Sequence, residues 1–227
     1  MDKLVSIIIP ALNEEALIEK TLVSLKEQHY RPIEIIVAVD SRSVDKTFQI
    51  AQNYADKVVC VSGEGASGVR NSGAKVARGE YLMFLDADTK VSKNLTGNGV
   101  EFLNSGYVGG FARVIYETRS PKIKLIEAVQ NFFLSQGTPF YVQSFYTTEE
   151  FFQKSGGWNE KISLGEEVDI LRRISKLGQL KYDSKSSIRT SPRRFIRNKD
   201  FSYAVLGAAL ALAGLKNLPY PPVREVK

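Results

Sequence analysis

The sequence has only one cysteine, Cys60, and one histidine, His29, among its 227 residues. These counts exclude a disulfide framework and a zinc site built from cysteine and histidine. A catalytic Cys–His pair would require these two residues to meet, and Cys60 is more simply a small core residue within a predicted strand. Chemistry in this chain must therefore come from carboxylates, hydroxyls and cationic side chains.

The chain also lacks a long hydrophobic run. Its first apolar stretch is short, ends at Pro10 and is followed by no small-residue cleavage site, so a cytoplasmic location is expected. The longest uncharged stretch, residues 201–215, is shorter than the ~20 residues that span a bilayer. It predicts an apolar C-terminal helix that packs on protein or dips into a membrane.

The net charge of +6 is unevenly spread. Residues 172–199 hold ten Lys and Arg against one acid, whereas residues 1–171 hold 18 bases against 22 acids. A basic segment of this kind indicates a partner that carries phosphates, such as a nucleotide, a lipid head group or a nucleic acid. Together with the apolar stretch, it predicts peripheral membrane contact through residues 172–215, at the inner face of the membrane.

Apolar runs alternate with helix-like segments in the first half of the chain, at residues 5–9, 34–39, 57–61 and 81–85. Ile18, Leu22 and Leu25 have helical spacing, which predicts a helix over residues 14–28 capped by Asn13. Further helices are expected after Ser43 and after Gly68. The pattern predicts an α/β fold with a mostly parallel, Rossmann-like sheet flanked by helices. After Asp88 the alternation stops, and a strand over 111–116 and a helix over 123–134 are expected as an addition to the sheet.

Ligands of parallel α/β sheets bind beyond the carboxyl ends of the strands. The fourth predicted strand ends in "DADT", so Asp86 and Asp88 lie two residues apart and project to the same side of an extended backbone. Two such carboxylates can hold one hard divalent cation, whose remaining positions go to diphosphate oxygens. A polar turn after a strand is the plainer explanation of the same residues.

Gly63, Gly65 and Gly68 form a G-x-G-x-x-G pattern between a predicted strand and a predicted helix, and Asp86 follows about 20 residues later. This pattern raises the alternative of a nicotinamide-dependent oxidoreductase. The dinucleotide fingerprint normally follows the first strand of its unit, however, and here two strand–helix units come earlier. Such a fingerprint also gives no role to Asp88.

Four ordered motifs resemble family 2 glycosyltransferases with the GT-A fold: "SIIIPALNEE", "EIIVAVDSRSVDKT", "GVRNSGAKVARGEYLMFLDADT" and "SGGWNEKISLGEEVDILRRISKLG". The resemblance covers roughly residues 3 to 198, and it is nearest to enzymes that act on lipid-linked or polyprenyl-phosphate acceptors. It implies a GT-A domain over residues 1–198, in which 1–89 form the nucleotide-sugar half and 90–198 the acceptor and catalytic-base half. Residues 199–227 would form the C-terminal apolar helix and tail.

The resemblance implies a metal-dependent, inverting transfer of a sugar from a nucleotide diphosphate sugar, usually UDP-linked, to a hydroxyl or phosphate acceptor. The uneven charge of the chain favours a phosphate-bearing, lipid-linked acceptor over nucleic acid. Asp88, with Asp86, would hold Mg²⁺ or Mn²⁺ through a D-x-D motif. The implied nucleotide-sugar contacts are Pro10, Ala11, Asn13, Glu14, Asp40, Arg70, Asp86 and Ala87.

The motif "GEEVD" implies Glu167 as the base that takes the acceptor proton, where the family usually has Asp, with Glu166 or Asp169 as alternatives. The acidic first turn of a helix is the plainer explanation. Acceptor and phosphate contacts are expected at Trp158, which could equally be a packed core aromatic, and at Arg193 and Arg194, which could equally form a solvated surface.

The second motif departs from the family. Asp40 is followed by Ser41 and Arg42, where relatives often have a second acid and then glycine, so a role of the second acid is lost or moves to Asp45. This departure, together with Glu in place of Asp at Glu167, leaves a non-catalytic sugar-nucleotide-binding protein as a further alternative.

Overall fold

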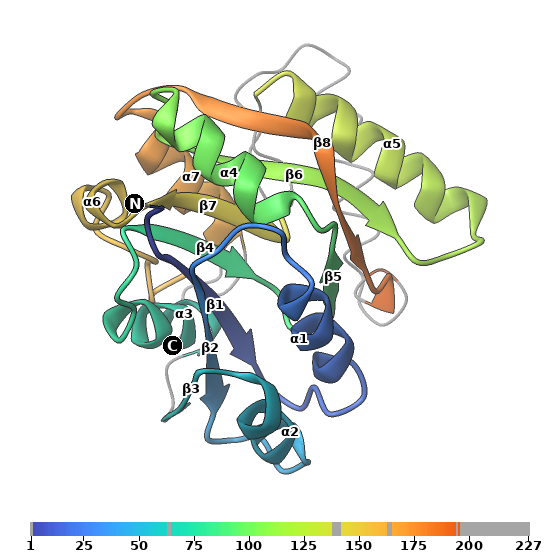
Figure 1. The fold of residues 1–227 in the computed structure, drawn as a ribbon. Coiled ribbons are helices and arrows are strands. Elements are labelled where there is room, and N and C mark those ends of the chain that lie inside the picture. Colours follow the sequence, from blue (N-terminus) through green and yellow to red (C-terminus); the bar gives the residue numbers. More distant parts are fainter. Residues whose placement is uncertain (1, 63–64, 138–141, 163–164, 194, 196–227) are drawn as a thin grey trace.

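The computed structural model describes residues 2–62, 65–137, 142–162, 165–193 and 195. These residues form an eight-stranded mixed sheet with helices on both faces (Figure 1). The strand order is β3-β2-β1-β4-β7-β6-β8-β5. The described fold therefore consists of a parallel N-terminal half that continues into a mixed C-terminal half.

The first half contains the four predicted strands, β1 (Val5–Ala11), β2 (Ile33–Asp40), β3 (Lys57–Val61) and β4 (Tyr81–Leu85), and all four run parallel. They alternate with α1 (Ile18–Lys26), α2 (Thr47–Tyr54) and α3 (Gly65–Lys75). The central strands β1, β2 and β4 are buried along nearly their whole length. Their continuous apolar sequences suit a sheet covered on both faces.

The second half continues with β5 (Thr89–Val91), α4 (Leu95–Asn104), β6 (Gly109–Tyr116), α5 (Pro121–Ser135), β7 (Ser144–Thr148), α6 (Glu149–Lys154), α7 (Glu166–Ser175) and β8 (Leu180–Thr190). Strand β7 is antiparallel to both β4 and β6, whereas β6 and β8 run parallel. The expected strand at 111–116 and helix at 123–134 are thus confirmed within β6 and α5. The addition to the sheet also includes β5, β7 and β8.

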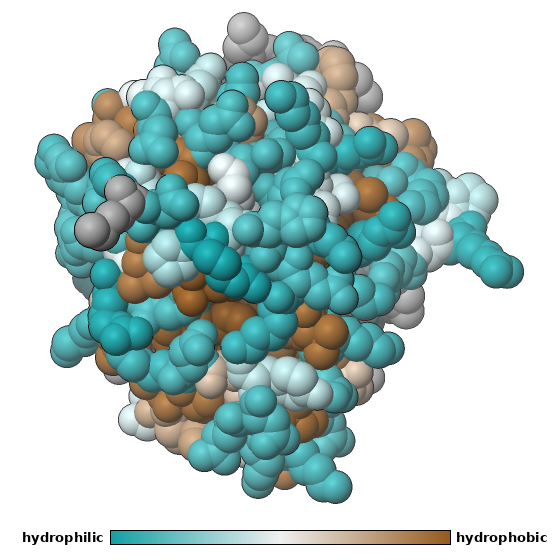
Figure 2. Space-filling view, in the orientation of Figure 1, coloured by the Kyte–Doolittle hydropathy of each residue, from teal (hydrophilic) through white to brown (hydrophobic). Residues whose placement is uncertain are grey.

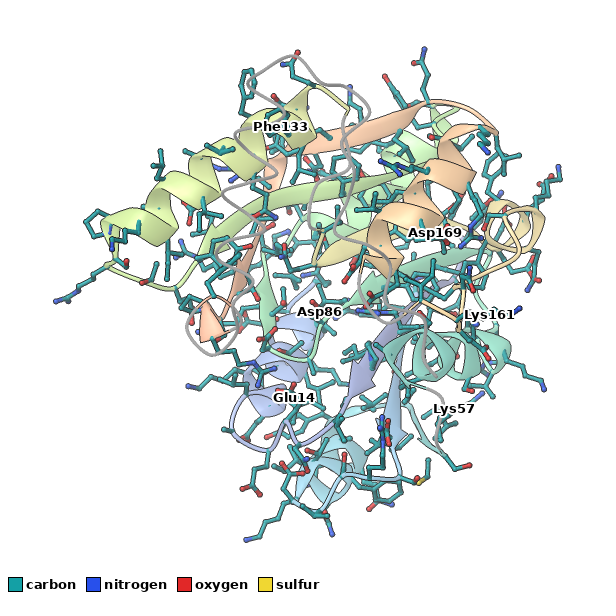
Figure 3. The ribbon with its side chains drawn as sticks, turned by 180° about the vertical axis from the view of Figure 1, so that it is seen from behind. Glu14, Lys57, Asp86, Phe133, Lys161 and Asp169 are labelled. Atoms are coloured by element: carbon teal, nitrogen blue, oxygen red, sulfur yellow. The ribbon has the colours of Figure 1, made fainter. Side chains whose placement is uncertain are left out.

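Helices α1 and α4 cover the face seen in Figure 1, and α3, α5 and α7 cover the face seen in Figure 3. The predicted stripe Ile18, Leu22 and Leu25 of α1 is fully buried. Helix α3 packs directly on β1 and β2. At Gly73 the approach is close, since an added Cβ would lie 2.5 Å from Cγ2 of Ile8.

Two local predictions were wrong. Asn13 does not cap α1, because the helix begins at Ile18 and Asn13 adopts a left-handed backbone with φ 54°. Its side chain instead accepts a hydrogen bond from the amide of Val44. Cys60 is exposed rather than a core residue, because it lies on β3, at one end of the strand order.

One large cluster of buried hydrophobic side chains joins both halves, from Val5 in β1 to Ile188 in β8. No helix among the described residues is long and apolar enough to cross a membrane. The predicted apolar helix at 201–215 lies outside the described residues. The face shown in Figure 2 is mostly hydrophilic, with hydrophobic side chains showing mainly across its centre and lower half.

Candidate active site

A cavity of about 220 Å³ lies where β1, β2 and β4 end. Residues from both halves of the sheet line it, which is the arrangement expected of a ligand site in an α/β fold. Eight of the predicted site residues are in its wall: Pro10, Ala11, Glu14, Asp40, Arg70, Asp86, Ala87 and Asp88, and the C-terminal half adds the predicted Arg193.

The loops after β1 and β2 are tied together beside this cavity. The amide of Glu14 donates to Thr47 Oγ1 at 2.7 Å, and the amide of Glu15 donates to Asp45 Oδ2 at 3.0 Å. The exposed side chain of Asn13 also joins the two loops, because its Oδ1 accepts a hydrogen bond from the amide of Val44. Asn13 is not among the residues that line the cavity. Asn13 and Asp45 thus shape the loops, while Glu14 reaches the cavity wall.

Arg70, in α3, is buried at the centre of an acidic cluster. Its Nη2 is 3.0 Å from Asp86 Oδ1 and 3.8 Å from Glu167 Oε1, and its Nη1 is 3.3 Å from Glu166 Oε1. Burial lowers the pKa of Arg70, but the surrounding carboxylates of Asp86, Glu167 and Glu166 outweigh burial and raise it. One guanidinium therefore links the end of β4 to the start of α7.

Beneath Arg70 lies Trp158, with its ring centroid 4.6 Å from the guanidinium carbon. Trp158 is 3% exposed, packs edge-on against Phe84, and is not among the residues that line the cavity. In the described structure it supports Arg70 by a cation–π contact from within the core. Asn71 holds the same loop, since its side chain bonds both the amide and the carbonyl of Trp158 at 2.9 Å.

Asp40 ends β2 and forms a forked ion pair with Arg42. Arg42 Nε donates to Asp40 Oδ1 at 2.9 Å and Nη2 donates to Oδ2 at 2.5 Å. The hydrogen bond from Arg42 holds the pKa of Asp40 below its ordinary value despite burial. Arg42, which stands where relatives often have glycine, thus neutralises the remaining acid.

Asp88 and Glu14 share the guanidinium of Arg193, the third residue after β8. Arg193 Nε lies 3.0 Å from Asp88 Oδ2, and Nη2 donates to Glu14 Oε1. Burial raises the pKa of Glu14, the hydrogen bond and charge of Arg193 oppose the shift, and the charges of Asp88 and Asp86 add to it. Glu14 Oε2 is buried without a hydrogen-bond partner in the described part of the chain.

The three predicted base candidates occupy different environments on α7. Glu166 and Glu167 are nearly buried and contact Arg70, although neither is among the described lining residues. Asp169, in the same first turn of α7, pairs instead with Arg173, 2.6 Å between Oδ2 and Nη2. Figure 3 shows Asp169 on α7 and Glu14 well apart, with Asp86 between them in that view.

Sequence reasoning did not single out several lining residues, namely Leu12, Ala66, Val69, Tyr116, Gln143, Thr190, Ser191 and Phe195. Tyr116 could have been found, because it ends the predicted strand at 111–116. Gln143 directly precedes β7, Thr190 ends β8, and Ser191 and Phe195 follow it, and the sequence pattern revealed neither strand. The predicted Arg194 and Gly63 lie outside the described residues. Within the described ranges, no group of three or more His, Cys, Asp or Glu residues forms a metal-binding cluster.

The chain matches the family described as Glycosyl transferase family 2 over residues 6–201. It is 37% identical over 107 residues to UDP-Glc:alpha-D-GlcNAc-diphosphoundecaprenol beta-1,3-glucosyltransferase WfaP of Escherichia coli, covering 45% of this chain and 42% of that one. The chain spans less than two thirds of the length of the curated relatives it matches, including 42% of WfaP, 28% of EpsJ from Bacillus subtilis and 63% of a Haemophilus influenzae glycosyltransferase.

Two solved structures show the same fold. TarS 1-349 of S. aureus in complex with UDP-GlcNAc matches with a TM-score of 0.68 at 16% identity, covering 96% of this chain and 67% of that one. The mannosyltransferase PcManGT from Pyrobaculum calidifontis, in complex with GDP-Man and Mn²⁺, matches with a TM-score of 0.68 at 18% identity, covering 97% of this chain and 66% of that one. The family match spans most of the chain. The strand before Gly63, Gly65 and Gly68 is β3, an edge strand of the sheet, whereas a dinucleotide fingerprint follows the first strand of its unit, so the structure does not favour an oxidoreductase. The chain is a member of glycosyl transferase family 2 and has the GT-A fold.

Proposed function

We propose that this protein transfers a sugar from a UDP-linked nucleotide diphosphate sugar to an acceptor hydroxyl or phosphate. The transfer inverts the configuration at the anomeric carbon. The observation that carries the proposal is the cavity at the strand ends, where Asp86 and Asp88 lie beside Asp40 and Arg70. A UDP-linked donor and a diphosphoundecaprenol acceptor appear in the name of the E. coli relative, and they support a lipid-linked acceptor here.

The residues present fit a divalent cation that is bound together with the donor. Asp86 and Asp88 offer hard carboxylate oxygens to the cavity, and diphosphate oxygens would take the remaining positions, since the described residues hold no cluster of three or more His, Cys, Asp or Glu that could bind a metal alone. The buried Glu14 Oε2 in the same cavity wall has no partner among the described residues. Asp88 and Asp86 would hold Mg²⁺ or Mn²⁺, which supplies positive charge to the diphosphate of the donor. Asp40 and the loop from Pro10 to Glu14 would bind the nucleoside.

Glu167 would act as the base in this proposal. In an inverting reaction the bond from the anomeric carbon to the diphosphate breaks while the acceptor oxygen bonds to the opposite face, and the acceptor proton passes to a carboxylate. Arg70 would hold the metal ligand Asp86 and the base Glu167 in position relative to each other, because it contacts both. Glu166, which shares the same guanidinium, would position Arg70.

The proposal is tested by titrating UDP into the protein with and without Mn²⁺, then measuring hydrolysis and transfer with a panel of sugar nucleotides. Asp88→Ala should lose metal-dependent UDP binding, whereas Glu167→Gln should keep binding and lose turnover. Glu150→Gln, which removes an exposed carboxylate on α6, serves as the control and should retain both.

Two results would overturn the assignments. Full turnover in Glu167→Gln would refute the base and move it to Glu166. Nucleotide binding with no turnover of any donor would instead favour a non-catalytic sugar-nucleotide-binding protein.

A further inference from the structure

Arg193 occupies the position that a cation would take between Glu14 and Asp88. These acids come from the loops after β1 and β4, and their side chains are only 12% and 11% exposed. The side chain of Arg193 is 38% exposed, and it arrives from the end of β8, 179 residues along the chain from Glu14. The guanidinium of Arg193 thus bridges Glu14 and Asp88 and balances the negative charge of these two mostly buried acids.

The described lining of the cavity is nearly neutral because its charges pair with one another. It contains four carboxylates and three guanidiniums, and each guanidinium contacts a lining carboxylate: Arg42 with Asp40, Arg70 with Asp86, and Arg193 with Asp88 and Glu14. The remaining charge is −1, whereas the diphosphate of a sugar nucleotide carries about −2. The donor can be accommodated only if a cation is added or one of these guanidiniums turns toward it.

Arg193 is the guanidinium best placed to change partners. Arg70 is buried and held by three acids, so moving it would expose all of them. Arg42 is forked on Asp40 by both its Nε and its Nη2 and has no contact with Asp88 among those described. Arg193 is less enclosed than Arg70, since their side chains are 38% and 6% exposed, and its Nε lies 3.0 Å from Asp88 Oδ2.

A divalent cation on Asp88 would meet this guanidinium directly. Carboxylate oxygens are the ligands that Mg²⁺ and Mn²⁺ prefer, and Asp88 Oδ2 is the oxygen that faces Arg193. Two cations within a few ångströms of one another repel strongly in a partly buried site. The metal and Arg193 therefore compete for Asp88 as long as Arg193 has no other anion to bind.

We propose that Arg193 is a positioning residue that couples metal binding to donor binding: it holds Asp88 and Glu14 as an internal cation, yields Asp88 to the metal, and turns to the donor diphosphate. The inference rests on the proposed function, because it needs a metal on Asp88 and a diphosphate in the cavity. Coupling of this kind is reciprocal, so nucleotide should strengthen metal binding by the factor by which metal strengthens nucleotide binding.

The test measures the Kd of Mn²⁺ for the full chain from the electron paramagnetic resonance signal of free Mn²⁺, with and without saturating UDP. Without UDP, Arg193→Ala should bind Mn²⁺ about tenfold more tightly than the wild type, which corresponds to ~1.4 kcal/mol. With UDP the two proteins should have similar Kd values, so the coupling factor should fall about tenfold in the variant. A merely structural role for Arg193 would not tighten metal binding.

Matched variants separate competition from a general loss of positive charge. Arg42→Ala also removes a cation from the cavity wall but does not contact Asp88, so its Kd for Mn²⁺ without UDP should stay within about threefold of the wild type. Arg193→Lys keeps the charge and should retain most of the competition. Arg193→Gln replaces Arg193→Ala if the latter does not give a folded protein by thermal melting.

Two outcomes would overturn the inference, and they are distinguishable. If Asp88→Ala abolishes Mn²⁺ binding while Arg193→Ala leaves the Kd unchanged or weaker, the metal site stands and the role of Arg193 is wrong. If Asp88→Ala binds Mn²⁺ like the wild type, the metal site of the proposed function is wrong, and the inference fails with it.

Discussion

Replacing Arg70 with methionine should strongly destabilise the folded protein. The substitution keeps much of the length of the side chain but removes the charge that three carboxylates share, at 3.0, 3.3 and 3.8 Å. At an effective dielectric constant of about 20, a pair of charges 3.0 Å apart attracts by roughly 5 kcal/mol, much of which desolvation of the guanidinium cancels. Removing one partner of a buried pair typically costs about 3–5 kcal/mol, since the other charge remains buried.

The free energy of unfolding should be measured by urea denaturation near neutral pH, with thermal melting as a second observable. A loss of about 3–5 kcal/mol would lower the melting temperature by roughly 6–20 °C for a chain of this size. Lys154→Met is the control, because the side chains of Lys154 and its partner Glu150 are 56% and 67% exposed. Their ion pair should contribute only about 0–1 kcal/mol.

The reasoning would be refuted if Arg70→Met lost less than about 1 kcal/mol, or no more than Lys154→Met. Either result would mean that the acidic cluster at the start of α7 relaxes into solvent without Arg70. Arg70→Lys keeps the charge but not the fork of donors, so it should fall between the wild type and methionine. It also provides a measurable variant if Arg70→Met does not fold.

Gly73→Ala should destabilise by about 1–3 kcal/mol in urea denaturation, because its Cβ would meet Ile8 at 2.5 Å. Gly97→Ala in α4, where the nearest atom is 3.7 Å away, should be neutral or slightly stabilising, and equal effects at both sites would contradict the packing argument. Burial alone would raise the pKa of Glu34, but hydrogen bonds from Ser6 and Arg78 hold it below its ordinary value. Glu34 therefore stabilises the fold above its unfolded pKa of about 4.3, and this contribution is lost as the pH falls through the lower folded pKa. The penalty of Glu34→Gln, about 1–3 kcal/mol near pH 7, should accordingly shrink toward about pH 3, and a constant penalty would contradict this sign.

The first half of the fold could be predicted because its signals are local. The strand at 57–61 and the strand at 81–85 have the predicted bounds, since continuous apolar runs mark parallel strands. Only the second is buried along its length, because β3 lies at one end of the strand order. The second half gave weaker signals. Strand β8 is rich in Ser and Lys, and its main partner β6 lies about 70 residues earlier in the chain, so no local pattern reveals the pairing.

For the candidate site, too, local features could be predicted and contacts between distant residues could not. The acids after β1, β2 and β4 could be predicted, because strand ends in a parallel sheet converge on one edge. Arg70 and Arg193 were also named as site residues, but their pairing with these acids could not be predicted, since the contact between Arg193 and Glu14 joins residues 179 apart. The ring of Trp158 illustrates a different limit: its sequence fitted a sugar contact and a core aromatic equally, and burial beneath Arg70 depends on how α3 and the loop before α7 pack.

The adjacent pair Arg70 and Asn71 has a consequence for building hybrid enzymes. Arg70 contacts the acids of β4 and α7, while Asn71 bonds the backbone of Trp158, so two neighbouring positions of α3 align the loop that follows α6. A chimera that exchanges everything after residue 89 for the C-terminal half of a relative would keep this pair but replace its partners Trp158 and Glu166. Such swaps should work only between parents that place the same loop and glutamate beside α3, which makes α3 the segment to exchange together with the C-terminal half.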